Sequence, residues 1–209
     1  MRETGNGTAS RGSSPTTGAP PRRRFLKAAV AAGVSLGLAG VAKADDDKPG
    51  ADERPKPGDR FVQAEGEQAG KTVEPGDIRL DAEPLQVWPM DPVSKVVRDG
   101  SRLNQVLLLR LDPGSLDADT RAHSADGIVA FSAICQHAGC PVTGWVMGES
   151  GKQVLKCFCH NSEYDPRQNA AAVFGPAPRK LAALPVKIAG GALVVAHEFI
   201  GKVVPPQQG

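Results

Sequence analysis

The chain has few aromatic residues, no strong excess of charge and only four cysteines. Aromatic residues make up 4% of its 209 residues, and the formal net charge is +2. The basic run Arg22–Arg24 lies near the N-terminus and is not interleaved with aromatics, so we expect no nucleic-acid binding. The chain is instead rich in turn formers, with 24 glycines and 18 prolines. This composition favours short strands over long helices, and we predict an all-β fold.

The chain also lacks the length for two large domains. With 209 residues, of which 40% are hydrophobic, we expect one ordinary domain and some unstructured length. Two apolar runs bounded by turn residues, 104–111 and 127–134, predict buried strands. Two further β-rich runs within 184–199 meet at Gly190-Gly191, a pattern typical of a hairpin.

The first 44 residues look like a twin-arginine export signal. Arg22 and Arg23 precede a weakly hydrophobic run and Ala42-Lys43-Ala44, a cleavage pattern. The apolar run 28–42 would form roughly 22 Å of helix, whereas the hydrocarbon core of a membrane is about 30 Å thick. We therefore expect a cleaved signal and a periplasmic protein, with a retained membrane anchor as the alternative. The resemblance implies that the protein folds around a cofactor before export.

The segment that follows the signal predicts a flexible linker. Residues 45–76 are charged, rich in proline and glycine, and almost free of large apolar side chains. Such a segment buries too little surface to offset the entropy of ordering it. We assign residues 77–209 to the folded domain.

All four cysteines and two of the four histidines fall into two short segments, CQHAGC at 135–140 and CFCHNS at 157–162. An exported disulfide scaffold would use the cysteines but would not require a histidine in each segment. A tetrahedral zinc site needs four ligands rather than six candidates, and the redox motif C-x-x-C is absent. Another assignment uses all six residues. A C-x-H and a C-x-x-H set would supply the two thiolates and two imidazoles of a Cys2His2 iron–sulfur cluster, and the two remaining cysteines could form a disulfide between the segments.

The segments CQHAGC and CFCHNSEYDP, with FGPAP at 174–178, resemble the Rieske iron–sulfur proteins of the energy-transducing type. The resemblance covers roughly residues 127–195 and implies a Rieske-type antiparallel β-sandwich, with a [2Fe-2S] cluster held between two loops of a cluster-binding subdomain. It also implies which residues take which role. The inner iron is bound by Cys135 and Cys157, the outer iron by His137 and His160, and a disulfide joins Cys140 to Cys159.

The resemblance implies a role for three further positions. Ser162 would donate a hydrogen bond to a bridging sulfide and Tyr164 to the sulfur of Cys135, which raises the reduction potential. The segment Gly175–Pro178 matches a proline loop that covers the cluster. The family has glycine after the second histidine, where this chain has Asn161, so the loop geometry there is open to test.

The resemblance also implies an electron-transfer subunit rather than a catalyst by itself. Only 49 residues (209 minus 160) follow His160, so we do not expect the large catalytic domain of a Rieske oxygenase. The motif style and export signal favour the small subunit of arsenite oxidase, with the Rieske subunit of a quinol–cytochrome c oxidoreductase as the alternative. The expected partners are a larger subunit, containing molybdenum or being a cytochrome b, and a c-type cytochrome or similar acceptor. A zinc-binding or disulfide-stabilised binding module is the rival of a different class.

Overall fold

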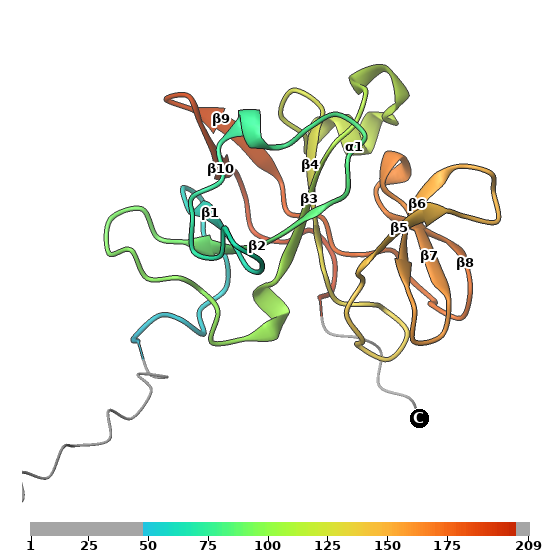
Figure 1. The fold of residues 1–209 in the computed structure, drawn as a ribbon, viewed down its shortest axis with the longest axis horizontal. Coiled ribbons are helices and arrows are strands. Elements are labelled where there is room, and N and C mark those ends of the chain that lie inside the picture. The colour runs from blue at the N-terminus through green and yellow to red at the C-terminus, as the bar shows by residue number, and fades with distance from the viewer. Residues whose placement is uncertain (1–47, 204–209) are drawn as a thin grey trace, which may run out of the picture. The chain divides into compact units, whose positions relative to one another are not determined.

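The computed structural model describes residues 48–203 (Figure 1). The predicted signal at 1–44 and the first residues of the predicted linker lie outside this range. Within residues 48–203 the fold consists of short antiparallel strands in three sheets, with one short α-helix, so the all-β prediction is confirmed. None of the helices in this part of the chain has the length and apolar character needed to span a membrane.

Four strands and a hairpin form the base of the domain. The strands pair in the order β1-β2-β3-β4, and the hairpin consists of β9 and β10. Main-chain hydrogen bonds connect the hairpin region to the sheet, from Gly58 N to the carbonyl of Val195 and from Leu184 N to the carbonyl of Ala130. One hydrophobic core, including Phe61, Val87 and Leu193, is enclosed by these elements. Their bounds are β1 Arg60–Gln63, β2 Leu85–Met90, β3 Val106–Arg110, β4 Ile128–Ser132, β9 Val186–Ala189 and β10 Ala192–Val195.

The central strands β3 and β4 are buried on both faces. Side chains alternate across a strand, so Val106 and Leu108 enter the base core while Leu107 and Leu109 enter a second core. In β4, the residues at 128–132 are all buried in the same way. The two predicted buried strands are therefore confirmed, and their continuous apolar runs follow from burial on both faces.

The second core lies under a smaller sheet that carries the candidate site. This sheet has the strand order β5-β6-β7-β8 and is inserted between β4 and β9 in the chain (Figure 1). Its β5 and β6 strands follow the first cysteine segment, and the second cysteine segment connects β6 to β7. The bounds are β5 Gly144–Met147, β6 Gln153–Cys157, β7 Ser162–Asp165 and β8 Ala171–Phe174.

Helical turns occupy the connections. The α-helix α1, Ala118–Ala122, begins after Asp117, whose side chain accepts a hydrogen bond of 2.7 Å from the main-chain N–H of Thr120. The hydroxyl of Thr120 donates to the carbonyl of Arg167, 3.1 Å away, which ties this helix to the turn after β7. The 3-10 turns are Pro75–Asp77, Arg102–Asn104, Pro113–Ser115 and Pro166–Gln168.

The predicted hairpin at Gly190-Gly191 is confirmed. The strand β9 pairs with β10 in antiparallel register, with Ala189 opposite Ala192. Both glycines have positive φ, 58° and 81°. Two consecutive residues with positive φ form a tight turn whose twist matches that of the hairpin strands. Glycine adopts positive φ without steric cost.

The prediction of a flexible linker is wrong for the described residues 48–76. Residues 60–63 form β1, which pairs with β2, and Phe61 and Val73 are fully buried. The charges that looked solvated include Asp59, which forms a buried ion pair with Arg98; each side chain is 3% exposed. Arg98 also donates to the carbonyl of Gly50. A few well-placed apolar residues and one buried ion pair thus order a segment whose average composition indicates disorder, and the folded domain begins well before residue 77.

Candidate metal centre

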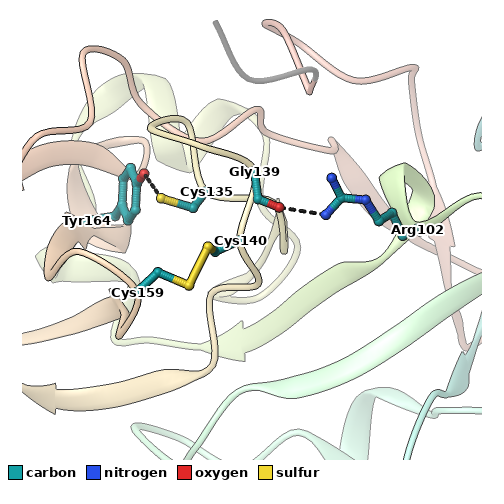
Figure 2. The surroundings of a disulfide bond; sticks show 6 residues. All are labelled: Arg102, Cys135, Gly139, Cys140, Cys159 and Tyr164. Carbon is teal, nitrogen blue, oxygen red and sulfur yellow. Dashed lines mark hydrogen bonds between the residues drawn. A yellow bond between two sulfur atoms is a disulfide. The ribbon is translucent and has the colours of Figure 1, made fainter. Parts of the chain in front are cut away.

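Two loops at one end of the smaller sheet bring the four cysteines together. The first loop follows β4 and contains Cys135 and Cys140, and the second follows β6, whose last residue is Cys157, and contains Cys159. A disulfide joins Cys140 to Cys159, with 6.5 Å between their Cα atoms (Figure 2). The expected disulfide is therefore confirmed, and it connects the two loops directly.

The two remaining cysteines are free and buried. Cys135 is 2% exposed and Cys157 is 1% exposed. The sulfurs of Cys140, Cys157 and Cys159 lie within 4.8 Å of one another, but the thiolate is the form that binds a metal, and two of these sulfurs are consumed by the disulfide. Only Cys135 and Cys157 can therefore supply thiolates.

Burial affects the chemistry of these thiols. Desolvation raises the pKa of Cys157, and contact with Cys135 adds to the effect. A buried thiol with a raised pKa stays protonated at neutral pH. Iron binds the thiolate, so metal loading of this site must release protons.

Two imidazoles lie on the outer side of the site. The rings of His137 and His160 meet edge to face, with their centroids 4.6 Å apart. His137 is half-buried, and its Nδ1 atom finds no hydrogen-bond partner among the described residues. A buried polar atom of this kind is costly unless it has a partner or a ligand. His160 is exposed.

The residues present fit a group that takes two thiolates and two imidazoles. The thiol pair is buried, the imidazole pair lies toward solvent, and one buried ring nitrogen needs a partner. This is the donor set of a two-iron cluster with mixed cysteine and histidine ligation. A tetrahedral zinc site with all four donors on one ion would not separate the donors into an inner and an outer pair.

Main-chain contacts fix the first loop. The N–H of Cys135 donates to the carbonyl of Cys140 at 2.8 Å, and the N–H of Gly139 donates to the carbonyl of Cys135 at 3.0 Å. Gly139 has a φ of +75°, which glycine tolerates best. Arg102, from a distant 3-10 turn, donates to the carbonyl of Gly139 at 2.6 Å (Figure 2). The loop is therefore held both by its own backbone and by a charged side chain from the base.

Tyr164 points its hydroxyl at the sulfur of Cys135 (Figure 2). The Oη–Sγ distance is 3.1 Å, and Oη also accepts a hydrogen bond of 3.0 Å from the N–H of Gln136. Burial, together with the adjacent Cys135, raises the pKa of Tyr164 above its ordinary value, so the hydroxyl stays protonated. A sulfur that binds iron is a thiolate, and Tyr164 must then be the donor.

This contact leads to a test of redox tuning. Tyr164→Phe keeps the ring but removes the donor, and a hydrogen bond to a charged group contributes about 1.5 kcal/mol. This bond strengthens as negative charge on the sulfur increases on reduction. If the whole contribution is gained on reduction, the potential of the variant falls by roughly 60 mV, because a tenfold change in a one-electron equilibrium corresponds to about 59 mV. An EPR-monitored redox titration measures this, with iron content as the control. An unchanged potential in a fully loaded variant would contradict the role assigned to Tyr164.

Ser162 and the proline loop lie against each other. The buried hydroxyl of Ser162 accepts a hydrogen bond of 3.2 Å from the N–H of Ala177, so its own hydrogen remains available for donation. Gly175 has a φ of +84°, and a Cβ there would lie 2.6 Å from the carbonyl oxygen of Asn161. Only glycine allows this close approach. Asn161 itself has a φ of 59°, in the left-handed region that asparagine tolerates, so the chain accommodates its departure from the family glycine.

Three side chains near the site were not found by sequence reasoning. Arg102 donates a hydrogen bond to the first loop at Gly139, and Arg179 donates one to Gln136 of the same loop. Arg102 and Arg179 are far in sequence from the loop that they contact. Gln136 lies between two candidate ligands, and its position inside the motif is the one feature that could have drawn attention to it.

The fold and the site together define a class of protein, a small β domain whose paired cysteines and histidines fit an iron–sulfur centre. Comparison with protein families is in agreement, since residues 82–185 match the Rieske [2Fe-2S] domain. The chain therefore carries a Rieske [2Fe-2S] domain, and its cofactor is a [2Fe-2S] cluster.

Similar proteins include subunits of respiratory complexes. The chain is 33% identical over 108 residues to the cytochrome bc1 complex Rieske iron-sulfur subunit of Mycobacterium tuberculosis, a match that covers 49% of this chain and 24% of that protein. It is 36% identical over 110 residues to a putative respiratory nitrate reductase subunit Rieske of Haloferax mediterranei, covering 52% of this chain and 48% of that protein. The matches thus span about a quarter to a half of these relatives.

A solved structure is also similar. The soluble domain of Rieske protein II from Sulfolobus acidocaldarius matches with 21% identity and a TM-score of 0.35. The match covers 44% of this chain and 61% of that one.

Proposed function

We propose that Cys135 and Cys157 bind the inner iron of the cluster and that His137 and His160 bind the outer iron. The buried thiol pair, the paired imidazoles and the unpartnered Nδ1 of His137 support this assignment. When bound, the cluster supplies a one-electron redox centre. The chain's own residues exclude water from the cysteine side, hold the two loops through the disulfide, and present one imidazole to the surface.

We further propose that the protein is the Rieske subunit of a quinol-oxidising complex of the cytochrome bc1 type. The observation that carries this proposal is the exposure of His160 together with that of two aromatic side chains from the second ligand loop and β8. Phe158, two residues before His160, is 60% exposed, and Phe174, just before the proline loop, is 46% exposed. An exposed imidazole can form a hydrogen bond with the hydroxyl of an apolar electron donor such as a quinol.

The similarities reported above favour this role over that of an arsenite oxidase small subunit, which the motif style favoured. Among the relatives described, the mycobacterial protein is a subunit of a cytochrome bc1 complex. In this proposal the partners are a cytochrome b, which contributes the quinol site, and a c-type cytochrome that accepts the electron.

We place this function on the periplasmic side of the cytoplasmic membrane. The disulfide between Cys140 and Cys159 is a bond that persists in oxidising compartments. The arginine pair and cleavage pattern in the first 44 residues support export, although these residues lie outside the described range. Whether the N-terminal segment is cleaved or retained as an anchor is part of the same test.

Affinity capture of the tagged full chain tests the complex. The protein is isolated from detergent-solubilised membranes and, separately, from the periplasmic fraction of the native cells. Mass spectrometry then identifies the largest partner and the N-terminal residue of the captured chain. We expect a cytochrome b in the membrane fraction. A molybdenum-containing subunit together with a chain that starts at Asp45 would overturn the quinol-oxidising role in favour of the arsenite oxidase one.

A further inference from the structure

We propose that Gln136 is a positioning residue that fastens the first ligand loop to the proline loop and to the end of the domain, and thereby sets the reduction potential. Gln136 lies between Cys135 and His137 in the chain and is fully buried. The inference rests on the proposed ligand set, because both of its neighbours are proposed to bind iron. Gln136 itself does not need to contact the cluster to act in this way.

The side-chain amide of Gln136 uses its full set of donors. Its Nε2 atom donates to the carbonyl of Ile134 at 3.1 Å and to the carbonyl of Val203 at 3.0 Å. Its Oε1 atom accepts a hydrogen bond of 2.9 Å from Nη2 of Arg179. A primary amide is the one neutral side-chain group with two donors and an acceptor, so no other neutral residue can make all three contacts from this position.

The partners come from three different segments. Ile134 belongs to the same loop, Arg179 directly follows the proline loop, and Val203 lies at the end of the described chain, 67 residues from Gln136 in sequence. The proline loop has a second attachment, from the N–H of Ala177 to the hydroxyl of Ser162. Gln136 and Ser162 therefore both hold the C-terminal side of this loop, each from a different ligand loop.

The main-chain N–H of Gln136 links this network to Sγ of Cys135 through the hydroxyl of Tyr164. Its N–H donates to Oη of Tyr164, and that contact leaves the hydroxyl hydrogen free for Sγ of Cys135. A shift of Gln136 would therefore weaken the hydrogen bond that Tyr164 donates to Sγ of Cys135. It would also remove one of the contacts that position the guanidinium of Arg179, whose positive charge favours the reduced, more negative centre. Both effects lower the reduction potential.

The test compares Gln136→Leu with the matched control Gln86→Leu in the full chain. Gln86 also accepts a side-chain hydrogen bond, from Gln105, but it lies in β2 of the base sheet. At a fixed solution potential near the wild-type midpoint, we expect the ratio of reduced to oxidised centre to fall about threefold to tenfold in Gln136→Leu, the effect of losing one hydrogen bond. The control should match the wild type. EPR-monitored titration gives the ratio, and the g-values report a change in the surroundings of the cluster.

A second variant covers the case in which Gln136→Leu does not retain iron. Arg179→Met removes the donor to Oε1 of Gln136 and leaves Gln136 itself in place. We expect a smaller fall in the ratio of reduced to oxidised centre. In the double variant the two effects should be less than additive, because they share one contact. An unchanged ratio in loaded Gln136→Leu, or in Arg179→Met when the first variant is not loaded, would overturn the proposal, as would full additivity.

The two proposals fail in different ways. A wild-type chain that shows no signal of a mixed-ligand [2Fe-2S] centre after iron loading would refute the ligand set. A wild-type chain with that signal and variants with unchanged potentials would refute only the role of Gln136.

Discussion

Cys157→Ser and His160→Ala are each expected to abolish the iron–sulfur centre while leaving the β domain folded. Cys157 is one of only two free cysteines within residues 48–203, and soft thiolate ligands are what an iron–sulfur cluster requires. A serine hydroxyl does not ionise at neutral pH. Substitution of a residue that only hydrogen-bonds to a metal ligand already costs about 10–100-fold in metal affinity. Loss of a ligand itself should therefore cost at least about 100-fold.

His197→Ala is the matched control for the histidine variant. His197 is exposed, and its ring contacts only the neighbouring main-chain carbonyl of Glu198 among the contacts described. Visible absorption, EPR and iron content per chain give the loading, and far-UV circular dichroism checks the fold. We expect full loading of His197→Ala and none of the two ligand variants. A normal spectrum from His160→Ala would show that the outer ligand has been misassigned.

Removal of the disulfide should weaken both the domain and its hold on the cluster. The bond between Cys140 and Cys159 closes a loop over a sequence separation of 19. In the chain-entropy description a loop of this size stabilises the folded state by about 3 kcal/mol. The same bond connects the two ligand loops, so its loss lets the Cys135 loop and the Cys157 loop move apart.

The double variant Cys140→Ser/Cys159→Ser measures this effect without leaving an unpaired thiol at either of the two substituted positions. Urea denaturation of the metal-free protein should give a free energy of unfolding about 3 kcal/mol lower than that of the wild type. Loaded protein should also lose its visible absorption faster on dilution into a chelator. Treatment of the wild type with a phosphine reductant should reproduce the change. Equal stability of variant and wild type would mean that the loops are held mainly by other contacts, such as that of Arg102 with Gly139.

Local pattern was sufficient to predict much of the fold and the site. The apolar runs 104–111 and 127–134 predict strands because continuous burial is a property of consecutive residues, and the pair Gly190-Gly191 predicts a hairpin because the turn needs two residues with positive φ. The candidate ligands could be proposed from two short motifs, because the spacing within each loop sets which side chains can reach one centre.

The linker prediction failed because average composition does not report the position of individual side chains. Residues 48–76 are polar overall, yet Phe61 and Val73 are buried and Asp59 pairs with a residue 39 positions away. Whether such a segment folds depends on a cavity and an ion partner that other parts of the chain provide.

The sequence alone determined the type of centre, its candidate ligands and the central strands, since each depends on residues that are close together in the chain. The tertiary structure alone decided which imidazole faces solvent and which distant side chains hold the ligand loops. Arg102, Arg179 and Val203 reach the first loop from segments 37 to 67 residues away from their partners. Contacts of this kind arise from how the chain packs, and no local pattern encodes them.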